Sequence, residues 1–337
     1  MPHEPKLTVY IITLTPSSTN IPWVTNRWLF RNHINQANTN VLQDGQIMTE
    51  LFRKFISDLD TPAMYSDTVS KKCMTANQSN GATTVNPNII LHSNECIIEG
   101  KVEGGTYGRK RNKTSITDKT DTSIVNESHA ITEDFYFLFY CPLASKKSVL
   151  MLQSYSDDTI DAVMKKFWKN FLSFPAVFNQ PTVSKYIPPS IVEDFKRDSK
   201  VSSFTYTTDV PGATLLDAPS TSNTRSYKVS IKITPNDELT IDEFESTAES
   251  LNDTPFARGV TLGQFNNKKG KLKDNSTNKQ SPFELDSNFE VAPVIFLPKY
   301  ITINGDNSDF PRIKEYCFGL LTTIRPEIYP QDAVRER

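Results

Sequence analysis

The chain has 337 residues, of which 37 are Lys or Arg and 39 are Asp or Glu, giving a formal charge of −2. This length is typical of two domains or one large one, and a hydrophobic fraction of 37% excludes global disorder. Because the charges nearly cancel, attraction to a polyanion must come from clustered basic residues. No apolar run approaches the ~18 residues that span a bilayer, and no signal peptide is evident. We therefore expect a soluble, cytoplasmic protein without membrane insertion.

The four cysteines give no sign of a metal centre or a disulfide framework. They lie far apart, form no CxxC pair, and are accompanied by only four His. Structural zinc sites and disulfide-rich domains instead have closely spaced Cys or His residues. The sequence thus indicates no metal and no cofactor, and predicts free thiols at Cys73, Cys96, Cys141 and Cys317.

The chain begins with a strand pattern followed by a helix pattern. Residues 7–14 are rich in β-branched side chains and are bounded by Pro5 and Pro16, which predicts a first strand. Apolar residues recur every three or four positions in 47–59, which predicts an amphipathic helix that packs on the sheet. The following segment, 66–88, is rich in Ser, Thr, Asn and Lys and is expected to be a loop.

The segment from 89 to 172 has the clearest pattern of the chain. Short strands are predicted at 89–92 and 95–102, before a basic stretch. FYFLFYCPL (135–143) and SVLMLQSY (148–155) are joined by a short polar connection, which predicts an antiparallel hairpin. An amphipathic helix with acidic residues in its first turn is predicted at 157–172.

Repeated prolines mark a boundary between two expected domains. Proline denies a segment continuous helical or ladder hydrogen bonds, and four prolines occur between 175 and 189. We therefore predict an α+β fold with an N-terminal domain at 1–178, a Pro-rich linker at 179–189 and a β-rich C-terminal domain at 190–337. Each domain is expected to be a mainly antiparallel sheet with a few packed helices.

The second half continues the mixture of strands and helices. Residues 226–233 (SYKVSIKI) alternate with a period of two, so Lys228 and Lys232 share a solvent-facing side of the predicted strand. The other predicted elements are a short helix at 190–198, a strand at 200–211, a loop at 209–225, a helix at 240–251, a Lys-rich hairpin, strands near 289–296 and 299–303, and a helix near 310–324.

A fragment of a nuclease motif is the only enzyme-like signal. Glu99, Gly100 and Lys101 match the E-x-K half of the PD-(D/E)xK pattern, in which strand-borne carboxylates hold a divalent metal. The pattern needs a further carboxylate, and the sequence does not select one. The residues weighed for that role are Asp44, Asp58, Asp60, Asp67 and, at even spacing from Glu99, Glu95. No nucleophile elbow and no glycine motif for nucleotide phosphates is present. Thus no catalytic residue is assigned, and Glu99 with Lys101 remains an alternative.

Two basic clusters exceed what an ordinary globular composition requires. Arg and Lys side chains in glycine-containing loops can neutralise phosphates and give affinity that falls steeply with salt. The alternative is that lysine-rich hairpin tips provide solubility and protect sheet edges. The first cluster is Lys101, Arg109, Lys110, Arg111 and Lys113, close to Gly104, Gly105 and Gly108, and the second is Lys268, Lys269, Lys271 and Lys273.

Several stretches resemble prokaryotic proteins encoded among anti-phage defence genes. They are EGKVEGGTYG, the segment from FYFLFY to KKFWKNFL, and YIPPSIVEDFKRDSKVSSFTYTTDVP. The nearest named group is formed by the DNA-binding proteins of Kiwa-type systems. The resemblance covers about half of the chain in general pattern and has no diagnostic motif, so it assigns no site residue. It implies an intracellular defence component that binds nucleic acid or other subunits and is encoded beside a partner protein.

The sequence therefore supports three hypotheses. The first is a non-catalytic nucleic-acid-binding component of a defence system, whose basic loops hold phosphates, with DNA as the favoured partner. The second is a metal-dependent nuclease, and the third is an interaction or scaffold subunit of a defence complex. A partner protein encoded nearby and a homo-oligomer both remain open.

Overall fold

The computed structural model describes residues 4–17, 25–33, 43–76, 88–155, 158–174, 178–215, 225–257, 259–285, 293–302 and 309–330. The chain forms two compact units, here termed unit 1 (Met1–Tyr186 with Ile295–Arg337) and unit 2 (Ile187–Val294). Both contain antiparallel strands and packed helices, which confirms the predicted α+β class. Among the described residues, no helix combines the length and apolar character needed to cross a bilayer.

Unit 1 is built on a nine-stranded sheet in which all pairs are antiparallel. The predicted hairpin is confirmed, with Phe139 opposite Leu150. The main path of the sheet runs through β10 (Phe178–Tyr186), β1 (Lys6–Pro16), β9 (Lys147–Ser154), β8 (Ile131–Tyr140), β5 (Ile97–Thr106), β3 (Lys72–Thr75) and β2 (Tyr65–Asp67), while β17 (Ile295–Phe296) pairs with β1 and β4 (Ile89–His92) pairs with β5.

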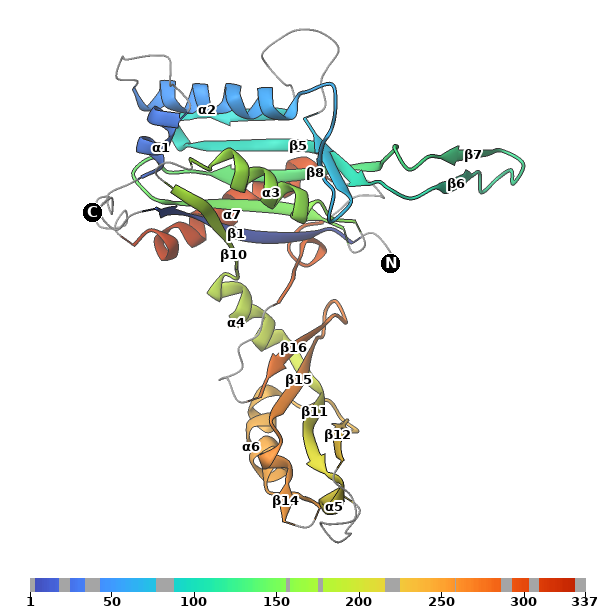
Figure 1. Cartoon of the computed structure of the whole chain (residues 1–337). Coiled ribbons are helices and arrows are strands. Elements are labelled where there is room, and N and C mark those ends of the chain that lie inside the picture. Colours follow the sequence, from blue (N-terminus) through green and yellow to red (C-terminus); the bar gives the residue numbers. More distant parts are fainter. Residues whose placement is uncertain are drawn as a thin grey trace. The chain divides into compact units, whose positions relative to one another are not determined.

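Helices cover both faces of this sheet (Figure 1). One face packs against α1 (Asn26–His33), α2 (Asp44–Leu59) and α3 (Asp161–Phe171). There Trp168 stacks on Phe55, with 5.2 Å between ring centroids, and on Phe139, at 3.8 Å. The opposite face carries α7 (Phe310–Ile328), which contacts β8. Because both faces of the sheet are buried at β8, the sequence of this strand is a nearly continuous apolar run.

A two-stranded ribbon projects from unit 1 beyond the sheet (Figure 1). Its strands, β6 (Arg111–Thr114) and β7 (Thr122–Val125), pair with each other and with no other strand. They lie between β5 and β8 in the sequence, so the ribbon is the outer end of that long hairpin. We term residues 107–130 the arm.

Unit 2 is a four-stranded antiparallel sheet with a helix over one face. The core between them contains Phe204, Phe244 and Phe283. Helix α6 (Ile241–Asn252) begins at Thr240, which forms a capping box with Glu243. The sheet order is β12 (Ser226–Ile233), β11 (Ser199–Pro211), β15 (Asn267–Asp274) and β16 (Gln280–Glu284), and the smaller elements of unit 2 are α4 (Pro189–Asp198), α5 (Gly212–Leu215), β13 (Pro255–Ala257), β14 (Val260–Thr261) and the 3-10 turn η2 (Leu262–Gln264). Two further 3-10 turns, η1 (Ser93–Glu95) and η3 (Leu297–Lys299), belong to unit 1.

The division between the units differs from the one expected at 179–189. Residues 179–186 of the expected linker belong to β10, which pairs with β1. Pro181 is accommodated there because β10 is an edge strand, whose outer side needs no donor. Residues 295–337, expected in the domain 190–337, belong to unit 1, where β17 pairs with β1. These pairings join distant segments, and local proline content does not reveal them.

Other local expectations also changed. Part of 66–88, expected as a loop, forms β2 and β3, because β3 completes the sheet beside β5. The predicted strand at 299–303 is absent from its described part, where Lys299 ends η3. Of the predicted strand at 289–296, residues 289–292 lie outside the described residues, and Ile295 and Phe296 form β17. The four cysteines are free, with Cys96 half-buried and the others buried.

Candidate nucleic-acid interface

The arm carries most of the first basic cluster. Arg109, Lys110 and Lys113 are exposed and Arg111 is half-buried. The base of the arm is closed by a hydrogen bond from the Gly108 amide to the Glu127 carbonyl. Arg111 pairs with Val125 and Lys113 with Ser123, so the two cations lie on the same face of the ribbon. The arm therefore presents Arg111 and Lys113 as a basic face of its ribbon, and Arg109 and Lys110 are exposed near its base.

Lys101 does not belong to this basic face. It lies on β5 within the sheet, where its Nζ donates to Asp134 Oδ2 at 2.9 Å. The same ammonium lies 5.0 Å from the centre of the Phe310 ring on α7. Lys101 therefore makes both an ion pair and a cation–π contact, whereas Arg109, Lys110, Arg111 and Lys113 make no ion pair with another described residue.

Most glycines of the first cluster are explained by packing. Gly104 and Gly105 are buried in β5, and a Cβ added at Gly105 would lie 1.8 Å from the Ile131 carbonyl oxygen. Gly108, at the base of the arm, has a φ of +86°, a region that L-residues with side chains rarely adopt. Of the three glycines, Gly108 alone is therefore placed where a phosphate could approach the backbone closely.

The second basic cluster lies on β15 of unit 2 and divides between the two faces of the sheet. Alternation places Lys269, Lys271 and Lys273 on one face. Lys268 is opposite Tyr206, which is completely buried under the helix-covered face, so Lys268 is turned away from the other three. Lys269 pairs with Glu284 at 3.2 Å and Lys273 with Glu238 at 2.7 Å. Lys271 is exposed and has no ion pair within the described residues.

Two lysines of β12 complete this surface, and the sequence reasoning did not assign them to a site. Thr205 of β11 is opposite both Lys232 of β12 and Lys269 of β15, so these three side chains share one face. Lys228 lies on the same face of β12, opposite Asp209. The period-two pattern of 226–233 had placed Lys228 and Lys232 toward solvent, but it gave no information on which strand lies beside them.

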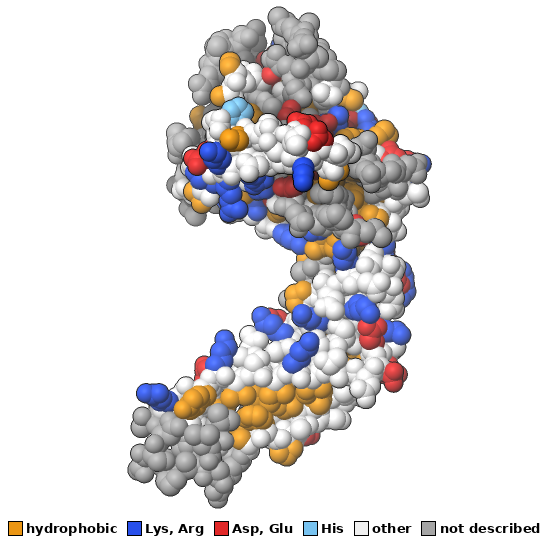
Figure 2. Space-filling view, turned by 90° about the vertical axis from the view of Figure 1, so that its right-hand side faces the viewer, with side chains coloured by type: hydrophobic (Ala, Val, Ile, Leu, Met, Phe, Trp, Pro, Cys, Tyr) orange, Lys and Arg blue, Asp and Glu red, His pale blue; other side chains and the backbone are white. Residues whose placement is uncertain are grey.

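We term Lys228, Lys232, Lys269 and Lys271 the lysine face. Its four cations share the sheet surface with the carboxylates of Asp209 and Glu284, so the positive charge is in excess. Hydroxyl side chains of β11 and β12 lie between the lysines. In the space-filling view, Lys and Arg side chains are spread along the visible side of unit 2, with carboxylates scattered among them (Figure 2). The arm belongs to unit 1 and the lysine face to unit 2.

The nuclease half-motif is enclosed rather than open. Glu99 is only 2% exposed, and its Oε1 accepts from Lys314 Nζ at 2.6 Å and lies 3.2 Å from His92 Nε2. Burial, and then the Glu99 charge, raise the pKa of the nearby Cys317 thiol well above its usual range. Within the described residues, no group of three His, Cys, Asp or Glu side chains is arranged to hold a metal ion.

The carboxylates weighed as partners of Glu99 have other roles. Asp44 accepts two hydrogen bonds from Arg27, Asp58 pairs with Lys54, and Asp67 pairs with Lys166. Asp60 is the C-cap residue of α2, and Glu95 lies in η1. None of these residues is paired with Glu99 across the sheet, where its neighbours are Ile90 and Leu138.

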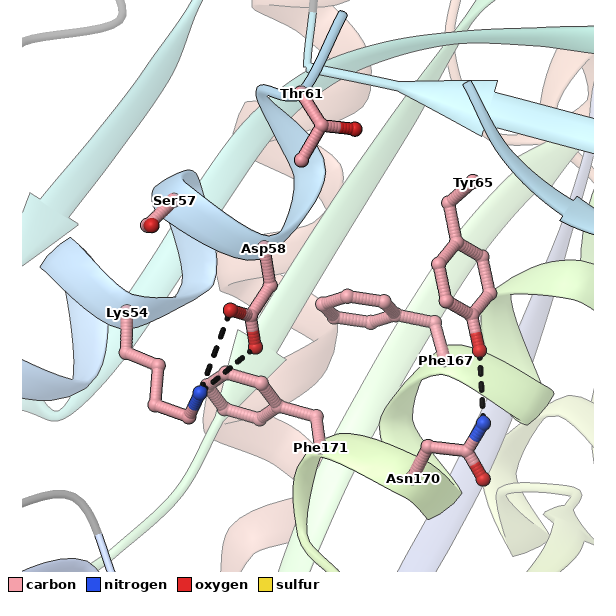
Figure 3. A pocket seen from close by; sticks show the side chains of 8 residues that line it. All are labelled: Lys54, Ser57, Asp58, Thr61, Tyr65, Phe167, Asn170 and Phe171. Atoms are coloured by element: carbon pink, nitrogen blue, oxygen red, sulfur yellow. Dashed lines mark hydrogen bonds and ion pairs between the residues drawn. The ribbon is translucent and has the colours of Figure 1, made fainter. Parts of the chain in front are cut away.

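Two pockets are formed by described residues of unit 1. A pocket of about 360 Å³ lies between α2 and α3, with the rings of Phe167 and Phe171 as its wall (Figure 3). Its polar groups bond to each other: Lys54 pairs with Asp58 at 3.0 Å, and Asn170 donates to the Tyr65 hydroxyl at 2.9 Å. A cleft of about 720 Å³ lies beside α7, where Arg325 is 5.3 Å from the centre of the Tyr140 ring. Neither combines a nucleophile with a base at hydrogen-bond distance.

Comparison of the chain with protein-family models, with curated proteins and with solved structures found no match. The functional argument therefore depends on the chemistry of the described surfaces. Of these, the lysine face is the one in which tertiary structure gathers like charges from strands that are distant in the sequence.

Proposed function

We propose that this protein binds nucleic acid without catalysing a reaction on it, and that its lysine face and arm hold the phosphate backbone. The observation that supports this most is that Lys232, Thr205 and Lys269 lie side by side across three adjacent strands. Lysines gathered on one side of a sheet repel one another, and the carboxylates of Glu284 and Asp209 offset only part of this charge, so a bound anion lowers the free energy of the assembly. A phosphate chain supplies that anion.

The physical basis of binding would be charge neutralisation. Each phosphate contact releases condensed counterions, which makes the affinity depend steeply on salt concentration. Hydroxyl groups such as that of Thr205 supply hydrogen-bond donors to phosphate oxygens between the ammonium groups. The exposed Arg109 and Lys110 of the arm add cations on unit 1. A near-neutral chain acquires affinity for a polyanion in this way.

The proposal includes a role in prokaryotic anti-phage defence, with DNA as the partner and a further protein encoded nearby. This part is supported by the sequence resemblance of residues 99–108, 135–172 and 186–211 to such proteins. We do not favour a nuclease, because Glu99 is buried and neutralised by Lys314. A metal-binding carboxylate needs access to the ion and to substrate.

The experiment is a titration of a fluorescent DNA duplex at several salt concentrations. Replacing Lys228, Lys232, Lys269 and Lys271 with Gln should lower the salt slope by up to ~0.9 per lysine that contacts a phosphate. The matched control replaces four lysines of unit 1 with Gln, namely Lys54, Lys146, Lys165 and Lys169, and should leave the slope near that of the unaltered protein. Equal affinity and slope for all three proteins would refute the proposal.

A further inference from the structure

The lysine face has an internal arrangement that points to the form of nucleic acid it holds. Its cations form two rows, Lys269 and Lys271 on β15 and Lys228 and Lys232 on β12. Strand β11 lies between them, so the rows are two strand spacings apart, or about 10 Å. Along each row, successive lysines are separated by about 7 to 13 Å, because same-face residues repeat every second position.

The floor between the rows is formed by short side chains. Thr205 and Thr207 of β11 occupy it, with the Asp209 carboxylate beside Lys228 at one end, and Thr207 Oγ1 lies 3.2 Å from Ser230 Oγ of β12. The lysine side chains are longer than these hydroxyl side chains, so the ammonium groups reach farther from the sheet. A ligand is therefore offered two lines of positive charge with hydroxyl donors between them.

Aromatic side chains of the four strands point away from this face. Phe204, Tyr206 and Phe283 are at most 3% exposed and belong to the core under α6. Tyr227 is also on the opposite side from Lys228, because neighbouring residues of a strand alternate. Proteins that hold single strands without sequence preference stack bases on aromatic rings. The described strands give the lysine face no such platform.

The four strands also contain no Arg, the residue that pairs most often with guanine through two hydrogen bonds. Lysine acts instead as a point charge that follows phosphate geometry. A duplex offers two phosphate chains on either side of a groove and keeps its bases stacked inside. A single strand offers one chain, and its exposed bases gain nothing on this surface.

We infer that the lysine face holds double-stranded nucleic acid, with one phosphate backbone along each lysine row, without reading the base sequence. This inference rests on the proposed function and adds the class of nucleic acid and the second row, Lys228 and Lys232. Both rows contact phosphate in this arrangement, so losing either row weakens duplex binding.

The test compares duplex DNA, duplex RNA and single-stranded DNA of one length as ligands of the full chain. The variants are Lys228→Gln with Lys232→Gln for one row and Lys269→Gln with Lys271→Gln for the other. We expect duplexes to bind about tenfold or more tightly than the single strand, and each row variant to lower the duplex salt slope by ~2. Comparison of duplex DNA with duplex RNA shows which duplex is preferred. Shuffling the duplex sequence should leave its affinity unchanged.

The Lys→Arg version of each row variant keeps the charge and should retain the duplex salt slope, which separates loss of charge from misfolding. Tighter binding of single strands, or a normal duplex slope after removal of the β12 row, would overturn the inference. If the charge variants still weaken single-strand binding, the proposed function stands. If no nucleic acid binds at all, both fail.

Discussion

Lys314 and Glu99 are 215 positions apart in the chain, yet Lys314 Nζ donates to Glu99 Oε1 at 2.6 Å. Both belong to unit 1, and the bond attaches α7 to β5 of the sheet. Glu99 is 2% exposed, whereas the Lys314 side chain is 37% exposed. The pair therefore neutralises a buried carboxylate from the edge of the core.

Removing Lys314 should destabilise unit 1. In a Lys314→Met variant, the Glu99 carboxylate stays buried without its ammonium partner, and the expected cost is about 1 to 3 kcal/mol after allowance for solvent screening at Lys314. All three Trp of the chain, Trp23, Trp28 and Trp168, are in unit 1, so Trp fluorescence during urea unfolding reports on this unit. Adding Glu99→Gln to the Lys314→Met variant should recover part of the lost unfolding free energy, because the buried carboxylate charge is then removed. A double variant no more stable than Lys314→Met would contradict this account.

Acid should weaken unit 1 through Asp67. Hydrogen bonds from Lys166 and then from Ser70 hold the pKa of the Asp67 carboxyl well below its usual range. A carboxyl with a lowered folded-state pKa contributes stability above its unfolded pKa, and this contribution is lost as the pH falls through the folded value. Below about pH 4, the unfolding free energy of the unaltered protein should therefore fall more steeply than that of Asp67→Asn. Lys166→Gln should likewise make the fall of the unfolding free energy at low pH less steep than in the unaltered protein. Parallel profiles for all three proteins would argue against this role.

Gly105 should be indispensable for packing, unlike Gly45. A Cβ at Gly105 would lie 1.8 Å from the Ile131 carbonyl oxygen, so Gly105→Ala must displace β5 from β8. We expect a loss of about 2 kcal/mol or more. Gly45 lies in the first turn of α2 with no atom within 4 Å of an added Cβ. Gly45→Ala should instead stabilise by about 0.5 kcal/mol, because it restricts the unfolded chain. Thermal unfolding measures both, and similar changes in the two variants would exclude the steric explanation.

The arm should be dispensable for the fold of unit 1. Its strands β6 and β7 pair with each other alone. Replacing residues 110–125 with Asn-Gly, a pair suited to a tight hairpin turn, should change the unfolding free energy by less than about 1 kcal/mol. The same variant removes Lys110, Arg111 and Lys113 and should lower the salt slope of nucleic-acid binding. An Arg111→Gln, Lys113→Gln variant, which keeps the ribbon, separates charge from shape. An unchanged slope in both variants would remove the arm from the interface.

Local sequence patterns determined much of the secondary structure. The apolar repeats at 47–59 and 157–172 correspond to α2 and α3, although α3 begins only at Asp161, and the two apolar runs around 142 form the β8–β9 hairpin. These features depend on residues within a few positions of each other, so side-chain periodicity and turn residues suffice to specify them. The alternation in 226–233 likewise assigned Lys228 and Lys232 to solvent.

Tertiary structure decided the features that depend on distant pairing. Residues 295–337 belong to unit 1, and Lys314 donates a hydrogen bond to Glu99. Strand register places Lys268 and Lys269 on opposite faces of the sheet. Tertiary structure also brought β12 and β15 to opposite sides of β11, which assembled the lysine face. The sequence by itself thus determined the α+β class, the amphipathic segments and the positions of the basic residues. Which basic residues share a surface was decided by strand register, because a shift of one residue moves every side chain to the other face.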